Sequence, residues 1–425
     1  MADTAAQITP HRRNFGLQAA GEASFVAGTT IASTEGLLTW FATHMGGSYI
    51  LAALVVPICM LGNLGSVYYL AAHLTRMERR RIAVVFLGSA VVGVLMALAI
   101  VLPLVSGYAG IAFLLLAGIA YGMFSGLFTI AQTELKKRCL ADDHIVRAQL
   151  IGAGLGGITT LGILLVLHFT LPWTLASHSN LLWLAAIAWV GAIVAFGYVQ
   201  EASAGAGRRA GERPRRLVLG VAMRQRWFRG LSLNKFVFLS VELTVPFYVI
   251  HAATVHAPTL KNVTAIVGAL GIGSLIGGPL WSRMPRARPW IGASVAALVA
   301  ALGGVVILVV DDLDPTRLLY VHFSVLVVVA AAGVGANRSR VAVTYKALPA
   351  ENREAALGTY AAVGVVLMIG AATVLGAAAD LHNLALPLSV LVAANIAAAI
   401  YATTGMRRFW VSLARPAQQA LQPAR

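Results

Sequence analysis

Long apolar runs, separated by short polar stretches, fill most of the sequence. A helix that spans a bilayer needs about 20 mostly apolar residues, and twelve runs of this kind follow one another along the chain. Six lie in the first half, at residues 16–42, 50–74, 82–104, 109–133, 148–171 and 181–199. Six lie in the second half, at residues 231–250, 263–281, 290–310, 318–341, 357–378 and 384–404. The pattern predicts an all-α polytopic membrane protein with twelve transmembrane helices.

The placement of the basic residues orients the predicted helices. The 425 residues include 32 Lys and Arg against 16 Asp and Glu, and a net charge of +16 is also typical of nucleic-acid-binding proteins. Here, however, 29 of the 32 fall on one side of the predicted membrane, which leaves Lys261 and Arg317 on the other side and Lys235 inside a run. The positive-inside rule therefore predicts that both termini are cytoplasmic, and no nucleic-acid partner is expected.

An internal repeat relates the two halves of the chain. A pattern of Ser, Glu, two aromatic residues and His ends the first apolar run and recurs in the seventh, so that Glu35 and Glu242 are separated by 207 positions. The arginines that follow the second and eighth runs, Arg76 and Arg283, are separated by the same 207 positions. Two unrelated patterns that share one offset predict a duplicated six-helix unit.

The duplication predicts three parts. A six-helix bundle covers residues 1–200, a basic cytoplasmic linker covers residues 201–230, and a second six-helix bundle with a short cytoplasmic tail covers residues 231–425. Within the linker, residues 215–224 could form a helix on the membrane surface, and a solvated linker is an equal alternative. Because each copy has an even number of spans, we expect parallel repeats with a binding site between them near the middle of the membrane.

The helix number, the duplication and the basic linker resemble the major facilitator superfamily over nearly the whole chain. A local pattern supports the resemblance after the second and eighth runs, where the family combines glycines and an aspartate with several basic residues. The matching residues are Arg76, Arg79 and Arg80 in the first half and Gly278, Arg283 and Arg286 in the second, with other residues at the aspartate positions. The resemblance implies a secondary active transporter that moves a small organic solute by alternating access.

The resemblance also implies where functional residues lie, because helices 1, 4, 7 and 10 line the central cavity in the family. Candidates for binding the solute on these helices are Thr29, Tyr121, Gln132, Lys235, Glu242 and Asn337. Candidates for the cytoplasmic gate loops are Arg76, Arg79, Arg283 and Arg286, together with Asp143 and Glu351, which follow the fourth and tenth runs 208 positions apart.

Four charged residues inside the apolar runs are candidates in their own right. Glu22, Glu35, Glu242 and Lys235 each cost about 3 kcal/mol or more in hydrocarbon unless they are paired or hydrated. The three carboxylates are candidates for proton coupling, with a structural hydrogen bond or hydration as the alternative. Lys235 and Glu242 share a helix face about 10 Å apart in height, too far for direct pairing, so each is expected to need a partner from another helix or from the solute.

Several polar residues near the predicted helix ends have two interpretations. Arg338 and Arg340 are expected to contact headgroups or loops, and they would favour an anionic solute if they pointed into the cavity instead. His44 and His251 are expected at the outer ends of their helices, as interfacial residues. His322 is a candidate for proton relay, with a role in the core as the favoured alternative.

The driving force and the alternative functions follow from the motifs. A Gly-Lys-Ser/Thr phosphate loop is absent from the sequence, so protons rather than ATP are expected to drive transport, through Glu35 or Glu242. An integral membrane enzyme would be expected to show a motif such as His-Glu-x-x-His or Gly-x-Ser-x-Gly, and neither occurs. A transporter-like sensor or scaffold is the third hypothesis.

Composition gives an expectation for the location. A preference for Ala, Leu, Gly and Arg over Lys is typical of GC-rich bacteria, which favours a bacterial inner membrane. We expect a monomer in the lipid bilayer, with a small organic solute and protons as partners and with no cofactor or metal. The sequence leaves the identity of the solute and the direction of transport open.

Overall fold

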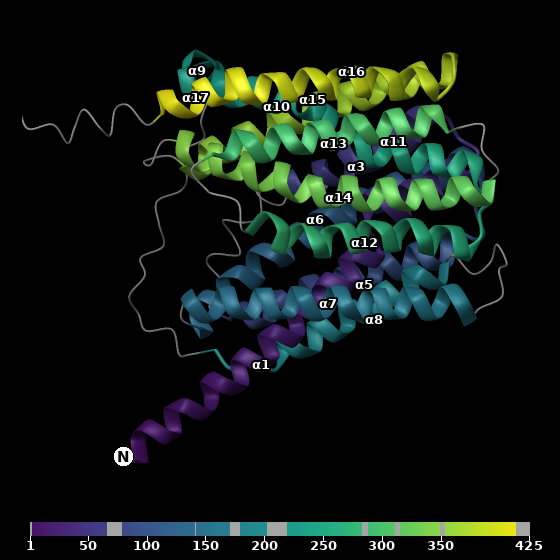
Figure 1. Cartoon of the computed structure of the whole chain (residues 1–425). Coiled ribbons are helices and arrows are strands. Elements are labelled where there is room, and N and C mark those ends of the chain that lie inside the picture. Colours follow the sequence, from purple (N-terminus) through teal and green to yellow (C-terminus); the bar gives the residue numbers. More distant parts are fainter. Residues whose placement is uncertain are drawn as a thin grey trace, which may run out of the picture. The chain divides into compact units, whose positions relative to one another are not determined.

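The computed structural model describes residues 2–65, 79–140, 142–170, 179–201, 219–282, 288–310, 315–348 and 353–413. Within these ranges the chain forms helices joined by short connections, and no described residue lies in a strand (Figure 1). Ten helical segments of the described chain are long and apolar enough to cross a membrane. The predicted class, an all-α polytopic membrane protein, is therefore confirmed.

The helices occur where the apolar runs predict them. The first half contains α1 (Ala2–Ile31), the π-helical turn η1 (Thr34–Leu38), α2 (Thr39–His44), α3 (Tyr49–Gly65), α5 (Arg80–Val101), α6 (Gly107–Cys139), α7 (Asp142–Thr170) and α8 (Ser179–Gly197). The second half contains α9 (Leu219–Arg224), α10 (Arg226–Val237), α11 (Leu239–Val255), α12 (Leu260–Ser282), α13 (Pro289–Val309), α14 (Pro315–Ala347), α15 (Arg353–Leu381), α16 (Ala385–Tyr401), η4 (Ala402–Met406) and α17 (Arg407–Ser412). The number of membrane crossings, twelve, stays a prediction, because the first run is interrupted and α3 is described for 17 residues.

Contacts between residues divide the chain into two compact units. Unit 1 contains Met1–Arg213 and Ala253–Gly271, and unit 2 contains Pro214–Ala252 and Ile272–Arg425. The stretch Ala253–Gly271 lies in the predicted second bundle but groups with the helices of the first half. The predicted limits of the two bundles, at residues 200 and 231, stay a prediction.

Helix lengths support the predicted duplication. α6 and α14 each contain 33 residues, and both their first residues (107 and 315) and their last residues (139 and 347) are separated by 208 positions. α7 and α15 each contain 29 residues. The repeated Ser-x-Glu motif lies at a helix interruption in both halves, since Ser33 caps η1 by accepting a hydrogen bond from the amide of Gly36 and α11 begins directly before Ser240.

In both units, pairs of helices approach each other closely at glycine residues. In unit 1, a Cβ atom on Gly122 of α6 would lie 1.9 Å from the carbonyl oxygen of Cys59 in α3, and one on Gly62 would lie 2.1 Å from that of Ile119. In unit 2, a Cβ atom on Gly273 would lie 2.4 Å from a carbonyl oxygen of α14. Small residues allow this approach of two backbones, from which helices in a membrane gain their van der Waals packing energy.

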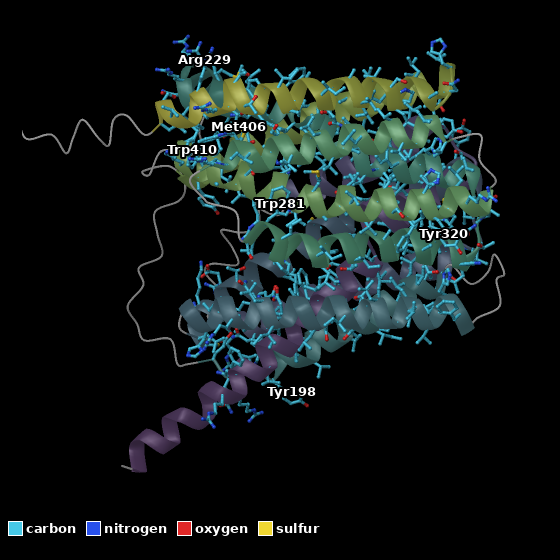
Figure 2. The ribbon with its side chains drawn as sticks, in the orientation of Figure 1. Tyr198, Arg229, Trp281, Tyr320, Met406 and Trp410 are labelled. Atoms are coloured by element: carbon cyan, nitrogen blue, oxygen red, sulfur yellow. The ribbon has the colours of Figure 1, made fainter. Side chains whose placement is uncertain are left out.

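Labelled side chains of unit 2 mark the two ends of its helices (Figure 2). Arg229, Met406 and Trp410 lie at one end, and Tyr320 lies at the opposite end (Figure 2). The ammonium of Lys346 lies 3.8 Å from the centroid of the Trp410 ring, within the range of a cation–π contact.

We expect alanine at position 122 to lower the free energy of unfolding by about 1–3 kcal/mol, because its methyl group would overlap a backbone oxygen of α3. Gly93 in α5 is the matched control, since nothing lies within 4 Å of the place that its Cβ atom would take. Thermal unfolding of the purified protein in detergent measures both variants. Equal melting temperatures for Gly122→Ala and Gly93→Ala would show that the two backbones do not meet at Gly122.

Candidate functional site

A buried cluster of three charged side chains lies in unit 2, where α10, α11 and α14 meet. The Lys235 ammonium donates to both carboxylate oxygens of Glu242, at 2.6 Å each, and a guanidinium nitrogen of Arg340 pairs with Oε1 of the same carboxylate. The side chains of Lys235 and Glu242 are each 11% exposed, and that of Arg340 is 20% exposed. One carboxylate is therefore shared by two cations.

The contact between Lys235 and Glu242 corrects the prediction that the two residues lie too far apart to pair. Seven residues do separate two backbone positions by about 10 Å along a helix axis. The long, flexible stem of lysine and the shorter stem of glutamate together span this height. The height of about 10 Å therefore separates the two backbone positions, and the two side chains together bridge it.

The position of Arg340 is a second correction. The sequence predicts a headgroup or loop contact for it, but α14 continues to Ala347, and Arg340 lies within this helix and pairs with Glu242. Arg338, two residues earlier on the same helix, is exposed. The two arginines therefore differ in environment, although the sequence treats them alike.

Helix α15 completes the surroundings of the cluster. A Cβ atom on Gly364 would lie 2.7 Å from Cε of Lys235, so the glycine leaves room for the lysine stem. Tyr360, one turn earlier on α15, is hydrogen-bonded to Thr344, which lies one turn after Arg340 on α14. The charged cluster thus has a hydroxyl pair beside it and a small residue at the lysine.

A second buried ion pair lies in unit 1, between α1 and α6. Glu22 pairs with Lys136 and also accepts a hydrogen bond from the side-chain amide of Gln132, at 2.6 Å. The side chain of Lys136 is 3% exposed and that of Glu22 is 13% exposed. A Cβ atom on Gly152 of α7 would lie 2.5 Å from Cβ of Glu22. The predicted apolar run ends at residue 133, whereas α6 continues to Cys139 and contains Lys136.

The two clusters use equivalent positions on the fourth helix of each half. Gln132 of α6 and Arg340 of α14 are separated by 208 positions, the same offset as the two helices themselves. Each contacts a carboxylate in the first predicted apolar run of its half, Glu22 in α1 and Glu242 in α11. By sequence, however, the repeat partner of Glu242 is Glu35, which is exposed in η1. The structure therefore places Glu22, not Glu35, in the environment that corresponds to Glu242.

The remaining predicted residues differ in their local environments. Thr29 donates to the carbonyl oxygen of Phe25 at 2.9 Å, Tyr121 is buried, and Asn337 is exposed. Of the predicted gate residues, Arg79 directly precedes α5 and is exposed, and Asp143 belongs to α7. The side chain of Asp143 lies outside the described part of the chain, as do Arg76, Arg283, Arg286 and Glu351.

Two histidines for which different roles were predicted, His251 and His322, form a buried pair in unit 2. Nδ1 of His251 lies 2.9 Å from Nε2 of His322, and Nδ1 of His322 lies 3.0 Å from the carbonyl oxygen of Leu318. Because a carbonyl oxygen only accepts, this geometry assigns a proton to Nδ1 of His322. α11 continues one turn beyond His251 to Val255, and His251 is 5% exposed, so its ring is buried in the protein, while its expected position at the outer interface stays a prediction.

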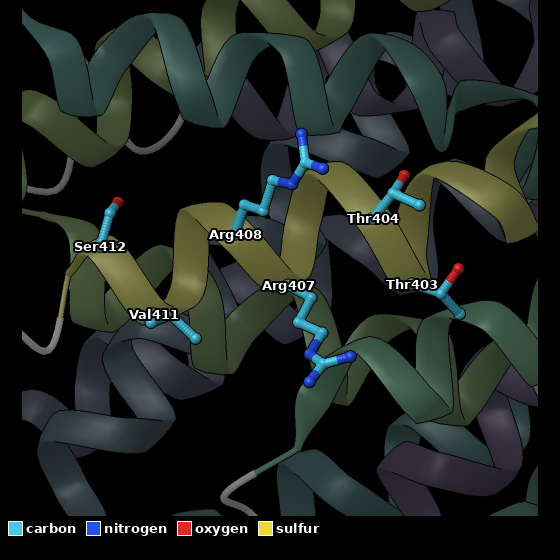
Figure 3. Close-up of a pocket in the computed structure, with 6 residues that line it drawn as sticks. All are labelled: Thr403, Thr404, Arg407, Arg408, Val411 and Ser412. Carbon is cyan, nitrogen blue, oxygen red and sulfur yellow. The ribbon is translucent and has the colours of Figure 1, made fainter.

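A surface hollow near the end of unit 2 is separate from the charged cluster. It is lined by Thr403, Thr404, Arg407, Arg408, Val411 and Ser412 (Figure 3). Arg407 and Arg408 point to opposite sides of the helix, and both threonine hydroxyls donate to the carbonyl oxygen of Ile400. Among the described residues that line it, none is a carboxylate. In the described part of the chain, no group of three or more His, Cys, Asp or Glu residues could hold a metal ion.

Comparison with known proteins gives matches in structure. No protein-family model matches the sequence, and no curated protein matches it either. A mutant of the nucleoside transporter NupG superposes with a TM-score of 0.64 at 12% identity, over 92% of this chain and 99% of that one. A POT family transporter in complex with a thioalcohol-conjugated peptide gives a TM-score of 0.65 at 13% identity, over 93% and 96%. The human organic anion transporter MFSD10 gives 0.53 at 14% identity, over 92% and 99%.

These three proteins are transporters of the major facilitator superfamily fold, and the described chain has the same fold. The predicted resemblance is confirmed at this level. At identities of 12–14%, the structural likeness shows the fold alone. The class of solute has to be inferred from the residues of this chain.

Removal of one partner of the Glu22–Lys136 pair is expected to cost more than removal of both. Glu22→Gln leaves a buried ammonium without its counter-ion, which lowers the free energy of unfolding by about 3–5 kcal/mol. The double variant Glu22→Gln/Lys136→Met is expected to recover most of this loss. Thermal unfolding in detergent, arranged as a double-mutant cycle, measures the coupling.

The exposed pair formed by Glu134 and Lys137 on the same helix is the matched control, with side chains 34% and 52% exposed. Its removal is expected to change the free energy of unfolding by less than about 1 kcal/mol. Additive effects of the Glu22 and Lys136 substitutions would contradict a direct interaction between these side chains.

Proposed function

We propose that the chain is a secondary active transporter that moves a small organic solute across a membrane by alternating access, with protons as the coupling ions and Glu242 as the proton-carrying group. The observation that carries the proposal is the cluster in which Glu242 lies between Lys235 and Arg340, in a chain with a transporter fold.

A carboxylate between two cations supports proton coupling because its charge decides whether the cluster holds together. While Glu242 is ionised, it joins α10 and α11 to α14 through Lys235 and Arg340. When it takes up a proton, both ion pairs weaken and the two cations repel each other. The cluster then has two arrangements that differ by one proton, and a proton can bias a conformational equilibrium between them.

Glu242 fits this role better than the other two candidate carboxylates. Glu35 is exposed in η1, where water or another polar group can meet its charge. Glu22 is balanced by Lys136 and hydrogen-bonded by Gln132, which supports a structural link between α1 and α6. Among these three carboxylates, Glu242 is the one paired with two cations.

Solute binding is proposed at the same cluster, with Lys235 and Glu242 as contacts. Thr29, Tyr121, Gln132 and Asn337 stay candidates for lining the cavity. The basic residues of the connections, Arg79 among them, stay candidates for the cytoplasmic gate. The bias of the 32 basic residues supports cytoplasmic N- and C-termini, and we propose a monomer in a bacterial inner membrane.

The fold likeness to transporters supports transport over the alternative of an integral membrane enzyme. A sensor or scaffold with the same fold would bind a solute without moving it. Measurement of solute flux across a membrane separates this alternative from a transporter.

We expect Glu242→Gln to abolish proton movement linked to solute transport. Proteoliposomes with a pH-sensitive dye inside are given a library of organic solutes, and the rate of the internal pH change is recorded. For solutes that produce proton flux with the wild type, the variant rate is expected to fall at least about tenfold, the effect of losing an essential proton-transfer group. Glu134→Gln, at an exposed carboxylate, is the control and is expected to keep the wild-type rate.

Two outcomes would contradict parts of this proposal. Unchanged proton flux in Glu242→Gln would remove Glu242 as the coupling group. A wild type that moves no member of the library in either direction, while binding some of them, would favour the sensor or scaffold.

A further inference from the structure

The charged cluster around Glu242 carries more positive than negative charge. Lys235 and Arg340 contribute two positive charges, and Glu242 contributes one negative charge. Between residues 213 and 310 the sequence contains one acidic residue, Glu242, and between residues 315 and 350 it contains none. The excess cation is therefore not balanced by an acidic side chain on α10, α11, α12, α13 or α14.

Helices α15 and α16, which also pack against α10, do not supply the balance either, since α16 contains no acidic residue. α15 contributes Gly364 and Tyr360 near Lys235 and Arg340. The two acidic residues of α15, Glu354 and Asp380, are ten and sixteen positions from Gly364, which corresponds to about 15 Å and about 24 Å along a helix. The neighbouring basic residues on α14 are Arg338 and Lys346, which add positive charge.

The two cations are also arranged to hold one carboxylate. The Lys235 ammonium donates to both oxygens of Glu242, and the Arg340 guanidinium converges on Oε1 from another helix. Lysine offers three donors and arginine five in a planar fork, and both groups form their strongest hydrogen bonds with carboxylate or phosphate oxygens. Glu242 occupies a place that a carboxylate of similar size would fit.

We propose that the solute is an organic anion with a carboxylate group, which binds Arg340 and Lys235 in place of Glu242 when Glu242 takes up a proton. This inference rests on the proposed function and names the class of its solute. The cluster has a net charge of +1 when Glu242 is ionised and +2 when it is protonated, so an anion is favoured and a cation disfavoured in both states.

The proposed exchange conserves charge and protons. One proton binds a carboxylate oxygen of Glu242, and one solute carboxylate then accepts the hydrogen bonds that Glu242 releases. The cluster keeps a net charge of +1 before and after the exchange. A proton and a monocarboxylate therefore enter the site together, and by linkage acid conditions raise the affinity for the anion.

The test uses purified full-length protein in detergent and matched pairs of probes that differ in charge. The probes are benzoate with benzamide and nicotinate with nicotinamide, added at millimolar concentration. Thermal stabilisation reports binding, because a ligand that binds the folded state raises the melting temperature. We expect the carboxylates to stabilise the wild type more than their amides do, and more strongly at pH 6 than at pH 8.

Two variants locate the binding site, and a third is the control. Arg340→Gln leaves the neutral Lys235–Glu242 pair and is expected to weaken carboxylate binding at least about tenfold, the loss of a charge-assisted hydrogen bond. Gly364→Ala is expected to weaken it as well, because its methyl group displaces the end of Lys235. Arg338→Gln removes the same charge from an exposed position of α14 and is expected to bind like the wild type.

Carboxylates that stabilise the wild type no more than their amides do would overturn the proposal, as would equal losses in Arg340→Gln and Arg338→Gln. These outcomes are separate from those of the flux measurement. Carboxylate binding at Arg340 without any flux would remove the transport function and keep the anion site. Proton-linked flux of neutral solutes without carboxylate binding would keep the transport function and remove the anion site.

Discussion

The cost of a charge inside a membrane is the constraint on which both buried clusters depend. An isolated ion in a membrane-spanning helix costs several kcal/mol, so Glu22 and Glu242 each need cations from another helix. Both obtain one from the fourth helix of their own half, Lys136 in α6 and Arg340 in α14. These ion pairs therefore link α1 to α6 in one half and α11 to α14 in the other. In unit 1 one lysine pairs with Glu22, whereas in unit 2 Lys235 and Arg340 share the carboxylate of Glu242.

This difference in balance gives the two halves different roles in the proposed transport cycle. The Glu22–Lys136 pair has no net charge, so it does not attract a further ion, and it is suited to a structural link between α1 and α6. The cluster at Glu242 changes its internal contacts with one proton and attracts an anion in either state. In a duplicated chain, one copy can keep an ion pair with a structural role, while in the other copy the solute replaces the carboxylate of Glu242.

Much of the fold could be predicted from the sequence, because membrane helices depend mainly on local composition. The apolar runs predict the helices. The offset of 208 positions between α6 and α14 differs by one from the 207 between Glu35 and Glu242, so the helix lengths favour the duplication, which stays a prediction. The contacts of the candidate site were harder to predict than the helices. The fourth apolar run ends at residue 133, before the first lysine, whereas α6 continues through Lys136 to Cys139. Arg340 lies inside the predicted tenth run, but its pairing with Glu242 is a contact between two helices, which the pattern of one helix does not reveal. The four-residue spacing of Gln132 and Lys136, which places both on one helix face, was the available signal.

The most direct test of Glu242 as a proton-exchanging counter-ion is the number of protons taken up when a carboxylate binds. Titration of wild-type protein with benzoate in weakly buffered detergent solution, followed with a pH electrode, measures this number. Uptake of about one proton per bound benzoate by the wild type, and none by Glu242→Gln, is the expected result, because binding and protonation are linked at one site. Equal proton uptake by the two proteins would contradict the role of Glu242.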